Sequence, residues 1–304
     1  MKAITFERFG TADVLRTAEL EIPQPGPGQV RVRVKAVGVN PVEGKIRSGS
    51  MQAFFPTPLP AIPGSEFAGV VDAVGAGVEG LAAGDEVLGW TQTGAYAEYA
   101  LADATVLAAK PAGLDWAHAA ALPVATDAAE RVIDALGVTA GETLLIHGAA
   151  GAVGSVTVQL ALARGARVLG TAGPGNQDHL AALGAAPLVY GDGLVERVRA
   201  LAPDGVDAVF DAAGKGALED SITLRGGTGR IVTIADFRAD ELGVVFEHGP
   251  QRQSAARLAE LARQAAAGDL VATVGAVHPL TAAAEAQRLS DAGHARGKLV
   301  LIVD

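Results

Sequence analysis

A glycine-rich turn is the segment of this sequence whose residue types and spacing indicate chemistry most directly. It reads HGAAGAVG over residues 147–154, with Ala149, Gly151 and Gly154 at the three small-residue positions of a dinucleotide fingerprint. Small residues let a pyrophosphate approach the backbone, and the free N–H groups of the following helix bind its oxygens. The same spacing occurs for packing reasons and in methyltransferases, but its place between a strand and a helix favours dinucleotide binding. We therefore predict cofactor contacts from Gly148, Ala149, Ala150, Gly151, Ala152, Val153 and Gly154.

The segment about 20 residues beyond the turn indicates which dinucleotide to expect. An NAD site usually carries a carboxylate there, which binds the ribose hydroxyls. Residues 171–177 read TAGPGNQ, and the first acid is Asp178. The missing acid favours a 2′-phosphate, so we predict NADP(H), although the usual basic partner of that phosphate is missing too. The phosphate would then depend on this segment, on backbone N–H groups or on a residue from elsewhere, and the predicted contacts are Thr171, Ala172, Gly173 and Asn176.

Two later strands also end in small or polar residues. Ligands of an open parallel sheet bind beyond the carboxyl ends of its strands. DAAG at 211–214 closes one predicted strand, and IAD at 234–236 closes the next. We predict that Asp211, Ala213, Ile234 and Ala235 contact the cofactor.

A parallel sheet is needed to position these residues. From about residue 115, short apolar strands alternate with helix-like segments, which predicts an α/β fold with helices on both faces of the sheet. The predicted strands are 143–147, 167–171, 187–190, 207–211 and 229–235, and the predicted helices are 153–164, 176–183 and 194–201.

The chain before residue 115 has a different pattern. β-Branched runs at 30–39, 68–74 and 86–88 alternate with proline- and glycine-rich turns, which is typical of an irregular all-β domain. The last part changes again, and its predicted elements are helix 254–267, strand 271–277, helix 282–290 and strand 298–303.

Composition excludes several classes of function. The 304 residues have a net charge of −10 without a basic block, so nucleic-acid binding is not expected. The absence of cysteine excludes disulfides, thiolate catalysis and cysteine-ligated zinc. Residues 1–10 lack the apolar core of a secretory signal, which predicts a cytoplasmic protein. Residues 143–163 lack Asp, Glu, Lys and Arg, but glycines interrupt them, which favours strand, turn and helix over a membrane span.

Ordered motifs over nearly the whole chain resemble the medium-chain dehydrogenase/reductase superfamily, in its zinc-free quinone oxidoreductase branch. The motifs are MKA at 1–3, PGPGQV at 25–30, GVNPVE at 38–43, RSG at 47–49, PGSEFAGVV at 63–71, GDEV at 84–87, GAYAEY at 94–99, ALP at 121–123 and GKLVL at 297–301, besides the glycine turn.

The resemblance implies a Rossmann doubly wound parallel sheet inserted into a GroES-like β domain. The GroES-like catalytic domain would comprise residues 1–115 plus 251–304, and the Rossmann domain would comprise residues 116–250. It also implies a cofactor in the cleft between the domains and a homodimer.

The resemblance makes the cysteine count informative about the reaction. Zinc alcohol dehydrogenases of this superfamily bind their catalytic zinc through cysteine and histidine. This chain has no cysteine, and its six histidines lack metal-ligand spacing, so we expect no metal. Without a Lewis acid to stabilise an alkoxide, quinones and enones are better expected substrates than simple alcohols, because their developing charge spreads into a conjugated oxyanion.

Three residues are candidates for catalysis. Asn40 matches a family asparagine that faces nicotinamide and substrate, or it caps its own turn before Pro41. Lys45 stands where many quinone oxidoreductases have tyrosine and would stabilise an enolate or quinol oxyanion; the alternative is a surface lysine. Arg47 matches a family arginine near the cleft, or it anchors a loop.

Lower-ranked candidates complete the prediction. Thr126 or Asp127 is offered in place of a family threonine, and Trp90 and Phe55 wall an apolar pocket or are simply core residues. The sequence thus predicts an NADPH-dependent, zinc-independent reductase of quinones or α,β-unsaturated carbonyls. The alternative is a non-catalytic, NADPH-responsive binding or structural protein of the same fold.

Overall fold

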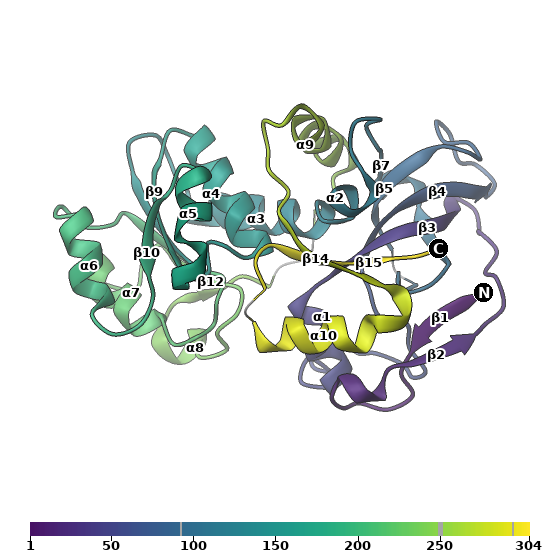
Figure 1. Cartoon of the computed structure of the whole chain (residues 1–304), viewed down its shortest axis with the longest axis horizontal. Coiled ribbons are helices and arrows are strands. Elements are labelled where there is room, and N and C mark those ends of the chain that lie inside the picture. Colours follow the sequence, from purple (N-terminus) through teal and green to yellow (C-terminus); the bar gives the residue numbers. More distant parts are fainter. Residues whose placement is uncertain (92, 249–251, 294) are drawn as a thin grey trace. The chain divides into compact units, whose positions relative to one another are not determined.

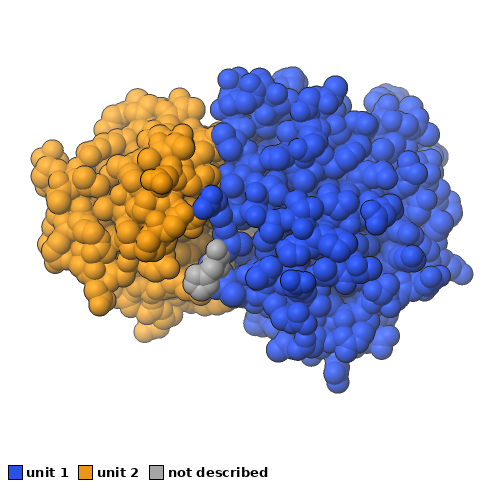
Figure 2. Space-filling view, in the orientation of Figure 1, with its two compact units in different colours: residues 1–124, 253–304 blue, residues 125–252 orange. Residues whose placement is uncertain are grey.

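The computed structural model describes residues 1–91, 93–248, 252–293 and 295–304. The chain forms two compact units, which Figure 2 colours separately. Unit 1 comprises residues 1–124 and 253–304, and unit 2 comprises residues 125–252. Unit 2 is therefore inserted into unit 1 along the sequence.

Unit 1 is built on a seven-stranded sheet in which β14, β15, β3, β4, β5 and β7 follow one another and β6 also pairs with β3. A separate two-stranded sheet pairs β1 with β2. The strands are β1 (Lys2–Thr5), β2 (Arg16–Glu19), β3 (Gln29–Val39), β4 (Glu66–Val74), β5 (Glu86–Trp90), β6 (Tyr99–Asp103), β7 (Leu107–Ala109), β14 (Val274–Pro279) and β15 (Lys298–Ile302).

The long strand β3 organises this unit. Val30, Val32 and Val34 alternate along it and are at most 1% exposed, as expected for a strand with one face on a core. β3 pairs with β15 in antiparallel register, with Val39 opposite Leu299. Because of this register, the start of the last strand lies beside the residue that follows β3, which is Asn40.

Helices cover this sheet and its ends. α1 packs against α10, as Figure 1 shows, while α2 packs on β3 and β4, and α9 packs on β7. The helices are α1 (Pro41–Ser48), α2 (Trp116–Ala120), α9 (Ala255–Ala267) and α10 (Ala283–Ala292), with 3-10 turns at Ala12–Val14, Ala104–Val106 and Leu280–Ala282. α1 replaces the expected turn at Asn40-Pro41, because proline suits the first turn of a helix.

Unit 2 contains a six-stranded sheet ordered β10-β9-β8-β11-β12-β13, in which every neighbouring pair is parallel. The strand order reverses between β8 and β11, so right-handed connections put the crossover helices on opposite faces. This confirms the predicted doubly wound sheet. The strands are β8 (Thr143–His147), β9 (Arg167–Ala172), β10 (Ala186–Val189), β11 (Ala208–Asp211), β12 (Ile231–Thr233) and β13 (Val245–Phe246).

Three helices of this region were not predicted from the sequence pattern: α3, α7 and α8. α3 (Pro123–Leu136) begins in unit 1 and continues in unit 2. The helices that follow α3 in unit 2 are α4 (Ala152–Ala163), α5 (Gln177–Ala182), α6 (Leu194–Leu201), α7 (Leu218–Arg225) and α8 (Ala239–Leu242), with a 3-10 turn at Pro174–Asn176. β12 is shorter than the predicted strand 229–235, because Arg230 has a φ of 57° and cannot extend it.

The uncharged stretch 143–163 forms β8, a turn and the whole of α4, which confirms the predicted order of strand, turn and helix. Among the residues that the structure describes, no helix combines the length and the apolar character needed to cross a bilayer.

Candidate functional site

The glycine turn joins β8 to α4 in unit 2. β8 ends at His147, and α4 begins at Ala152 with Gly151 as its N-cap. A side chain at Gly154 would place its Cβ 2.8 Å from the Cα of Ala149 and closer still to the carbonyl oxygen of Gly148. By contrast, a Cβ at Gly151 would meet only that carbonyl oxygen, at 3.3 Å. Gly154 is thus required for close packing of the helix, while Gly151 leaves open space at the helix start.

The alanine at the first fingerprint position is accommodated by a second glycine. Ala149 is fully buried and donates its N–H to the carbonyl oxygen of Thr171, at 3.0 Å. A Cβ at Gly170 of β9 would lie 2.9 Å from the Cβ of Ala149. The missing side chain on β9 therefore makes room for the extra methyl group in the turn.

The predicted cofactor residues of the turn remain accessible in part. Ala152 and Val153 are half-buried in the first turn of α4, which carries no acidic residue. The free N–H groups and the positive end of the helix dipole therefore form a phosphate-binding arrangement without competition from a nearby carboxylate in that turn. The site fits the pyrophosphate of a dinucleotide.

A buried histidine ties three elements together below the turn. His147 lies 3.3 Å from the hydroxyl of Thr171 through Nδ1 and 3.1 Å from the hydroxyl of Ser221 through Nε2. Ser221 donates its own proton to the carbonyl of Ala217, at 2.6 Å, so it accepts from Nε2–H. Burial lowers the pKa of His147, which keeps the ring neutral with Nδ1 accepting from Thr171. The hydroxyl of Thr171, a predicted cofactor residue, is therefore used inside unit 2.

Asp211 supports the loops after β11 and β12. It is fully buried, and it accepts the N–H of Ala213 at 3.0 Å, the N–H of Gly214 at 3.1 Å and the hydroxyl of Thr233 at 2.8 Å. Thr233 in turn accepts the N–H of Ala235, at 3.1 Å. The structure therefore places Asp211 under the loops. The other predicted cofactor residues here, Ala213, Ile234 and Ala235, are half-buried.

Unit 1 contains a buried polar cluster at the end of β3, made of Asn40, Glu43, Glu66, Tyr96 and Lys298. Lys298 donates to Asn40 Oδ1 and to Glu66 Oε1, both at 2.6 Å. Asn40 donates from Nδ2 to Glu66 Oε1 at 2.8 Å and to Glu43 Oε1 at 3.2 Å. All five side chains are at most 5% exposed. The register of β3 with β15 brings Lys298 to this place.

Glu43 and Glu66 share Asn40 as a donor, and each also has partners of its own. Glu43 accepts the hydroxyl of Tyr96 at 2.7 Å and the backbone N–H of Asn40 at 3.2 Å. Burial raises the pKa of Glu43 to about 7, against the lowering effect of those hydrogen bonds, and burial likewise raises the pKa of Tyr96. Glu66 also accepts the N–H of Val124, at 2.7 Å, in the first turn of α3, where a carboxylate is favoured.

Close backbone packing surrounds this cluster. A Cβ at Gly38 would lie 2.7 Å from the carboxyl carbon of Glu66 and 2.9 Å from the carbonyl oxygen of Ala120. Gly38 is therefore required where β3 passes Glu66 and α2.

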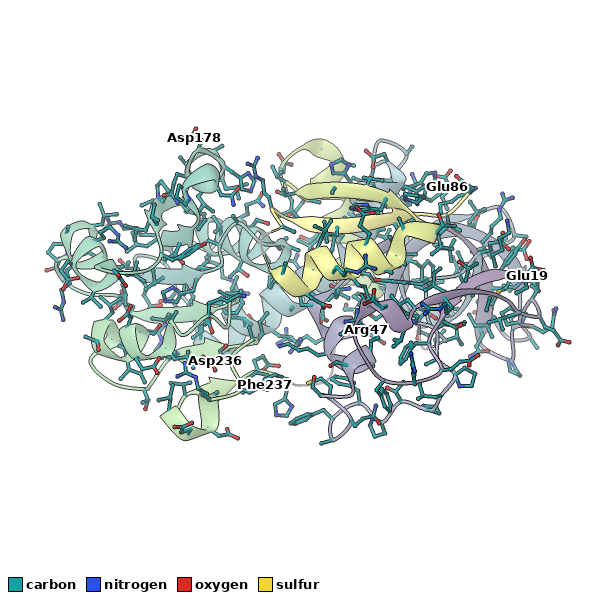
Figure 3. The ribbon with its side chains drawn as sticks, turned by 60° about the horizontal axis from the view of Figure 1, so that its bottom comes forward. Glu19, Arg47, Glu86, Asp178, Asp236 and Phe237 are labelled. Atoms are coloured by element: carbon teal, nitrogen blue, oxygen red, sulfur yellow. The ribbon has the colours of Figure 1, made fainter. Side chains whose placement is uncertain are left out.

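Arg47 is engaged where α1 meets α10. Its guanidinium forms an ion pair with Asp291 at 2.7 Å, donates to the side chain of Gln287, and donates through Nε to the carbonyl of Gly10 at 3.2 Å. Figure 3 labels Arg47 beside α10. These contacts correspond to the anchoring alternative. Asn40 is the N-cap residue of α1, but its side chain bonds to the side chains of Lys298, Glu66 and Glu43. Lys45 is half-buried on the same helix.

The remaining predicted residues are distributed as follows. Thr126 and Asp127 are buried in α3, where Asp127 accepts from Arg131 at 3.0 Å and from the N–H of Arg252 at 2.9 Å. Trp90 is buried, whereas Phe55 is 44% exposed. Sequence reasoning did not select Glu43, Glu66, Tyr96 or Lys298 as functional residues, although each lies inside a motif that carries the family resemblance.

Metal-ligating side chains do not gather in the parts of the chain that the structure describes. There, no group of three or more His, Asp or Glu side chains is placed to hold a metal ion. His294, one of the six histidines, lies outside the described residues.

Family models match both halves of the chain. Residues 26–112 match the alcohol dehydrogenase GroES-like domain, and residues 183–301 match a model described as zinc-binding dehydrogenase. That description belongs to the model, and this chain has no cysteine.

Two curated relatives are similar over most of the sequence. Quinone oxidoreductase from Homo sapiens is 31% identical over 100% of this chain and 98% of its own length. 2-Methylene-furan-3-one reductase from Solanum lycopersicum is 34% identical over 77% of this chain, and the match spans only 62% of that relative.

Solved structures agree with this relationship. Escherichia coli quinone oxidoreductase complexed with NADPH superposes with a TM-score of 0.88 at 25% identity, over 99% of this chain and 100% of that chain. A structure described as an NAD-dependent alcohol dehydrogenase has a TM-score of 0.88 at 33% identity, with 100% of both chains covered. The doubly wound unit, the GroES-like match and these full-length similarities lead to one conclusion: the chain belongs to the medium-chain dehydrogenase/reductase superfamily of oxidoreductases.

Proposed function

We propose that this chain is an NADPH-dependent, zinc-independent reductase of quinones or α,β-unsaturated carbonyl compounds. The observation that carries the proposal is the turn between β8 and α4, where Gly154 allows the helix to approach and Gly151 leaves the helix start open. Bound there, the nicotinamide cofactor would supply a hydride to the substrate. The names of the human and tomato relatives support the same substrate classes.

The residues of unit 2 account for cofactor binding. The first turn of α4 binds the pyrophosphate through its N–H groups. Ala213, Ile234 and Ala235 are half-buried and follow β11 and β12, where ligands of a parallel sheet bind. Asp211 and Thr233 hold these loops in place through the hydrogen bonds described above. In this proposal Asp211 is a positioning residue.

Among the predicted catalytic residues of unit 1, we assign Lys45 to the charge that develops on the substrate. Lys45 is half-buried and lies on α1, whose start is held by the buried cluster. A lysine ammonium would stabilise an enolate or quinol oxyanion as charge develops. Asn40 contributes by fixing the start of that helix, and Arg47 contributes by holding it against α10.

The contacts of Asn40 and Arg47 also support the second candidate function, a non-catalytic NADPH-responsive protein. Both side chains are engaged within unit 1, as a purely structural role requires. This candidate predicts cofactor binding without turnover.

One assay separates the two candidates. Oxidation of NADPH is followed by absorbance with a panel of quinones, enones and simple aldehydes, with and without a metal chelator. We expect turnover on a quinone or an enone that the chelator does not change. Saturable NADPH binding without turnover on any member would support the second candidate, and chelator-sensitive alcohol oxidation would contradict zinc independence.

The assignment of partners and location follows the same proposal. We predict a small-molecule substrate and a homodimer. We also predict a cytoplasmic location, with neither nucleic acid nor membrane as a partner. Sedimentation velocity of the purified protein tests the dimer, because a monomer at all concentrations would contradict it.

A further inference from the structure

Four neighbouring strands of unit 2 carry a row of buried polar side chains at their carboxyl ends. The parallel register places His147 of β8 between Thr171 of β9 and Asp211 of β11, and it places Thr233 of β12 on the far side of Asp211. All four side chains are at most 1% exposed. Ligands of a parallel sheet bind beyond these strand ends, so the row lies where it can hold the loops of the proposed cofactor site.

The row divides into two hydrogen-bonded pairs. Asp211 accepts the hydroxyl of Thr233 at 2.8 Å, and it holds the loop after β11 as described above. His147 contacts the hydroxyl of Thr171 through Nδ1 at 3.3 Å, and its Nε2 lies 3.1 Å from the hydroxyl of Ser221 in α7. The imidazole therefore joins the end of β9 to the helix that packs on β11.

Thr171 connects the second pair to the glycine turn. Its carbonyl oxygen accepts the N–H of Ala149, in the middle of the turn, at 3.0 Å. The two residues that follow, Ala172 and Gly173, are predicted cofactor contacts. A hydrogen bond that fixes Thr171 before the cofactor arrives reduces the ordering cost of binding. Ser221, by contrast, donates its own proton at the start of α7.

We propose that His147 is a positioning residue for the cofactor turn, and that it acts through Nδ1 and Thr171, not through Nε2 and Ser221. The inference rests on the proposed function, since it assumes that the turn binds a nicotinamide dinucleotide. The imidazole is 1% exposed, so it affects the cofactor through Thr171 and not by contact. Loss of the Nδ1 bond should weaken NADPH about 3- to 10-fold, the value of one neutral hydrogen bond. Loss of the Nε2 bond should leave the affinity within about twofold.

Two amide side chains separate the roles of the two nitrogens. The amide oxygen of asparagine accepts at the place of Nδ1, whereas the amide nitrogen of glutamine donates at the place of Nε2. His147→Asn should therefore keep the NADPH affinity within about twofold, and His147→Gln should weaken it about 3- to 10-fold. Both variants lose one hydrogen bond and part of the ring, so both should lower the midpoint of thermal unfolding by similar amounts. A merely structural histidine would give affinities that follow these midpoints.

Substitutions at Thr171 test the same bond from its other end. Thr171→Val removes the hydroxyl and keeps the shape of the side chain, so it should weaken NADPH as much as His147→Gln does. Thr171→Ser keeps the hydroxyl and should preserve the affinity. The double variant His147→Gln with Thr171→Val should bind no more weakly than either single variant, because both remove one bond. A hydroxyl that contacted the cofactor directly would make the two effects add.

Ser221→Ala is the matched control, because it removes the other partner of the same ring. Ser221 is fully buried, and its substitution leaves the ring beside Thr171. It should lower the midpoint of thermal unfolding while leaving the dissociation constant for NADPH within about twofold. Thr171→Val and Ser221→Ala both keep the ring, so the inference stays testable even where a His147 variant does not fold.

Nicotinamide fluorescence of the full chain gives the dissociation constants, and circular dichroism gives the midpoints. Equal affinities of His147→Asn and His147→Gln would overturn the assignment of Nδ1, as would additive effects in the double variant. Weakening by Ser221→Ala as large as that by Thr171→Val would overturn it too. Each of these outcomes leaves the proposed function intact, whereas a native chain that bound no NADPH would contradict both.

Discussion

The polar groups buried at the end of β3 in unit 1 differ from those buried at the ends of β8 and β9 in unit 2. In unit 1, the end of β3 buries formal charges, with the ammonium of Lys298 2.6 Å from the carboxylate of Glu66. In unit 2, the ends of β8 and β9 bury neutral groups, since His147 is uncharged and bonded to the hydroxyls of Thr171 and Ser221. Removing one partner of a buried ion pair leaves a charge uncompensated, whereas a buried neutral group needs only a hydrogen bond. Unit 1 should therefore lose more stability when a buried side chain is removed. Unit 2 should lose more stability when a side chain is added in the glycine turn.

Removing the cation of the buried cluster should have the largest effect. Lys298→Met leaves Glu66 buried beside Asn40 without a positive partner, which should lower the free energy of unfolding of unit 1 by about 3–5 kcal/mol. Both tryptophans, Trp90 and Trp116, lie in unit 1, so urea unfolding followed by tryptophan fluorescence reports on it. The double variant Lys298→Met with Glu66→Gln should recover much of the loss. An unchanged midpoint for the single variant would show that the pair contributes nothing.

Added bulk in the glycine turn should produce the next largest effect. Gly154→Val forces a side chain against the backbone of Ala149 and Gly148, which should destabilise unit 2 by about 3 kcal/mol and remove most NADPH affinity. Circular dichroism and NADPH fluorescence measure the two effects. Gly229→Val is the matched control in open space. Unchanged NADPH binding by Gly154→Val would show that the turn does not bind the cofactor.

The pH dependence of the two units should also differ, because Glu43 titrates near neutrality. Its pKa is raised from 4.5 to about 7, so the stability it contributes is complete below pH 4.5 and is lost as pH rises through 7. Glu43→Gln mimics the protonated form, which does not titrate. Its free energy of unfolding relative to that of the unsubstituted chain should therefore rise by about 2 kcal/mol from pH 5 to pH 8.5. Urea midpoints at both pH values measure this gain. Glu19→Gln, at an exposed carboxylate, controls for net charge, and parallel behaviour of both variants would refute the assignment.

An exposed ion pair in unit 2 should have the smallest effect. Arg164 and Asp134 are 2.7 Å apart, with side chains 38% and 40% exposed. Arg164→Ala should change the free energy of unfolding by less than about 1 kcal/mol, because water and salt screen the pair. A loss as large as that of Lys298→Met would erase the distinction between buried and exposed charges.

Local patterns predicted most of unit 2 because its signals lie close together in sequence. The strand 143–147 and the turn that follows it were predicted as observed, since apolar runs and glycines are contiguous there. α3 was missed although its sequence begins with proline and continues with alanines and other helix formers, which is a recognisable helix start. α7 lacks a clear apolar stripe, so its helix depends on packing against β11.

The site in unit 1 was harder to predict because its members are distant in sequence. Asn40 was selected from its motif, but its partner Lys298 lies 258 residues away. Only the pairing of β3 with β15 brings them together. The same distance explains Arg47, whose ion pair with Asp291 spans 244 residues.

The amino-acid sequence by itself determined the doubly wound α/β class, the glycine turn and the family, because each depends on residue types at short, fixed spacings. It also determined that cysteine plays no part, since the chain has none. Only the tertiary structure decided that Asn40 is enclosed by Lys298, Glu66 and Glu43, and that Asp211 turns inward under its loop. The physical reason is that a side chain's chemical state depends on its burial and partners, which strand pairing sets and local sequence does not.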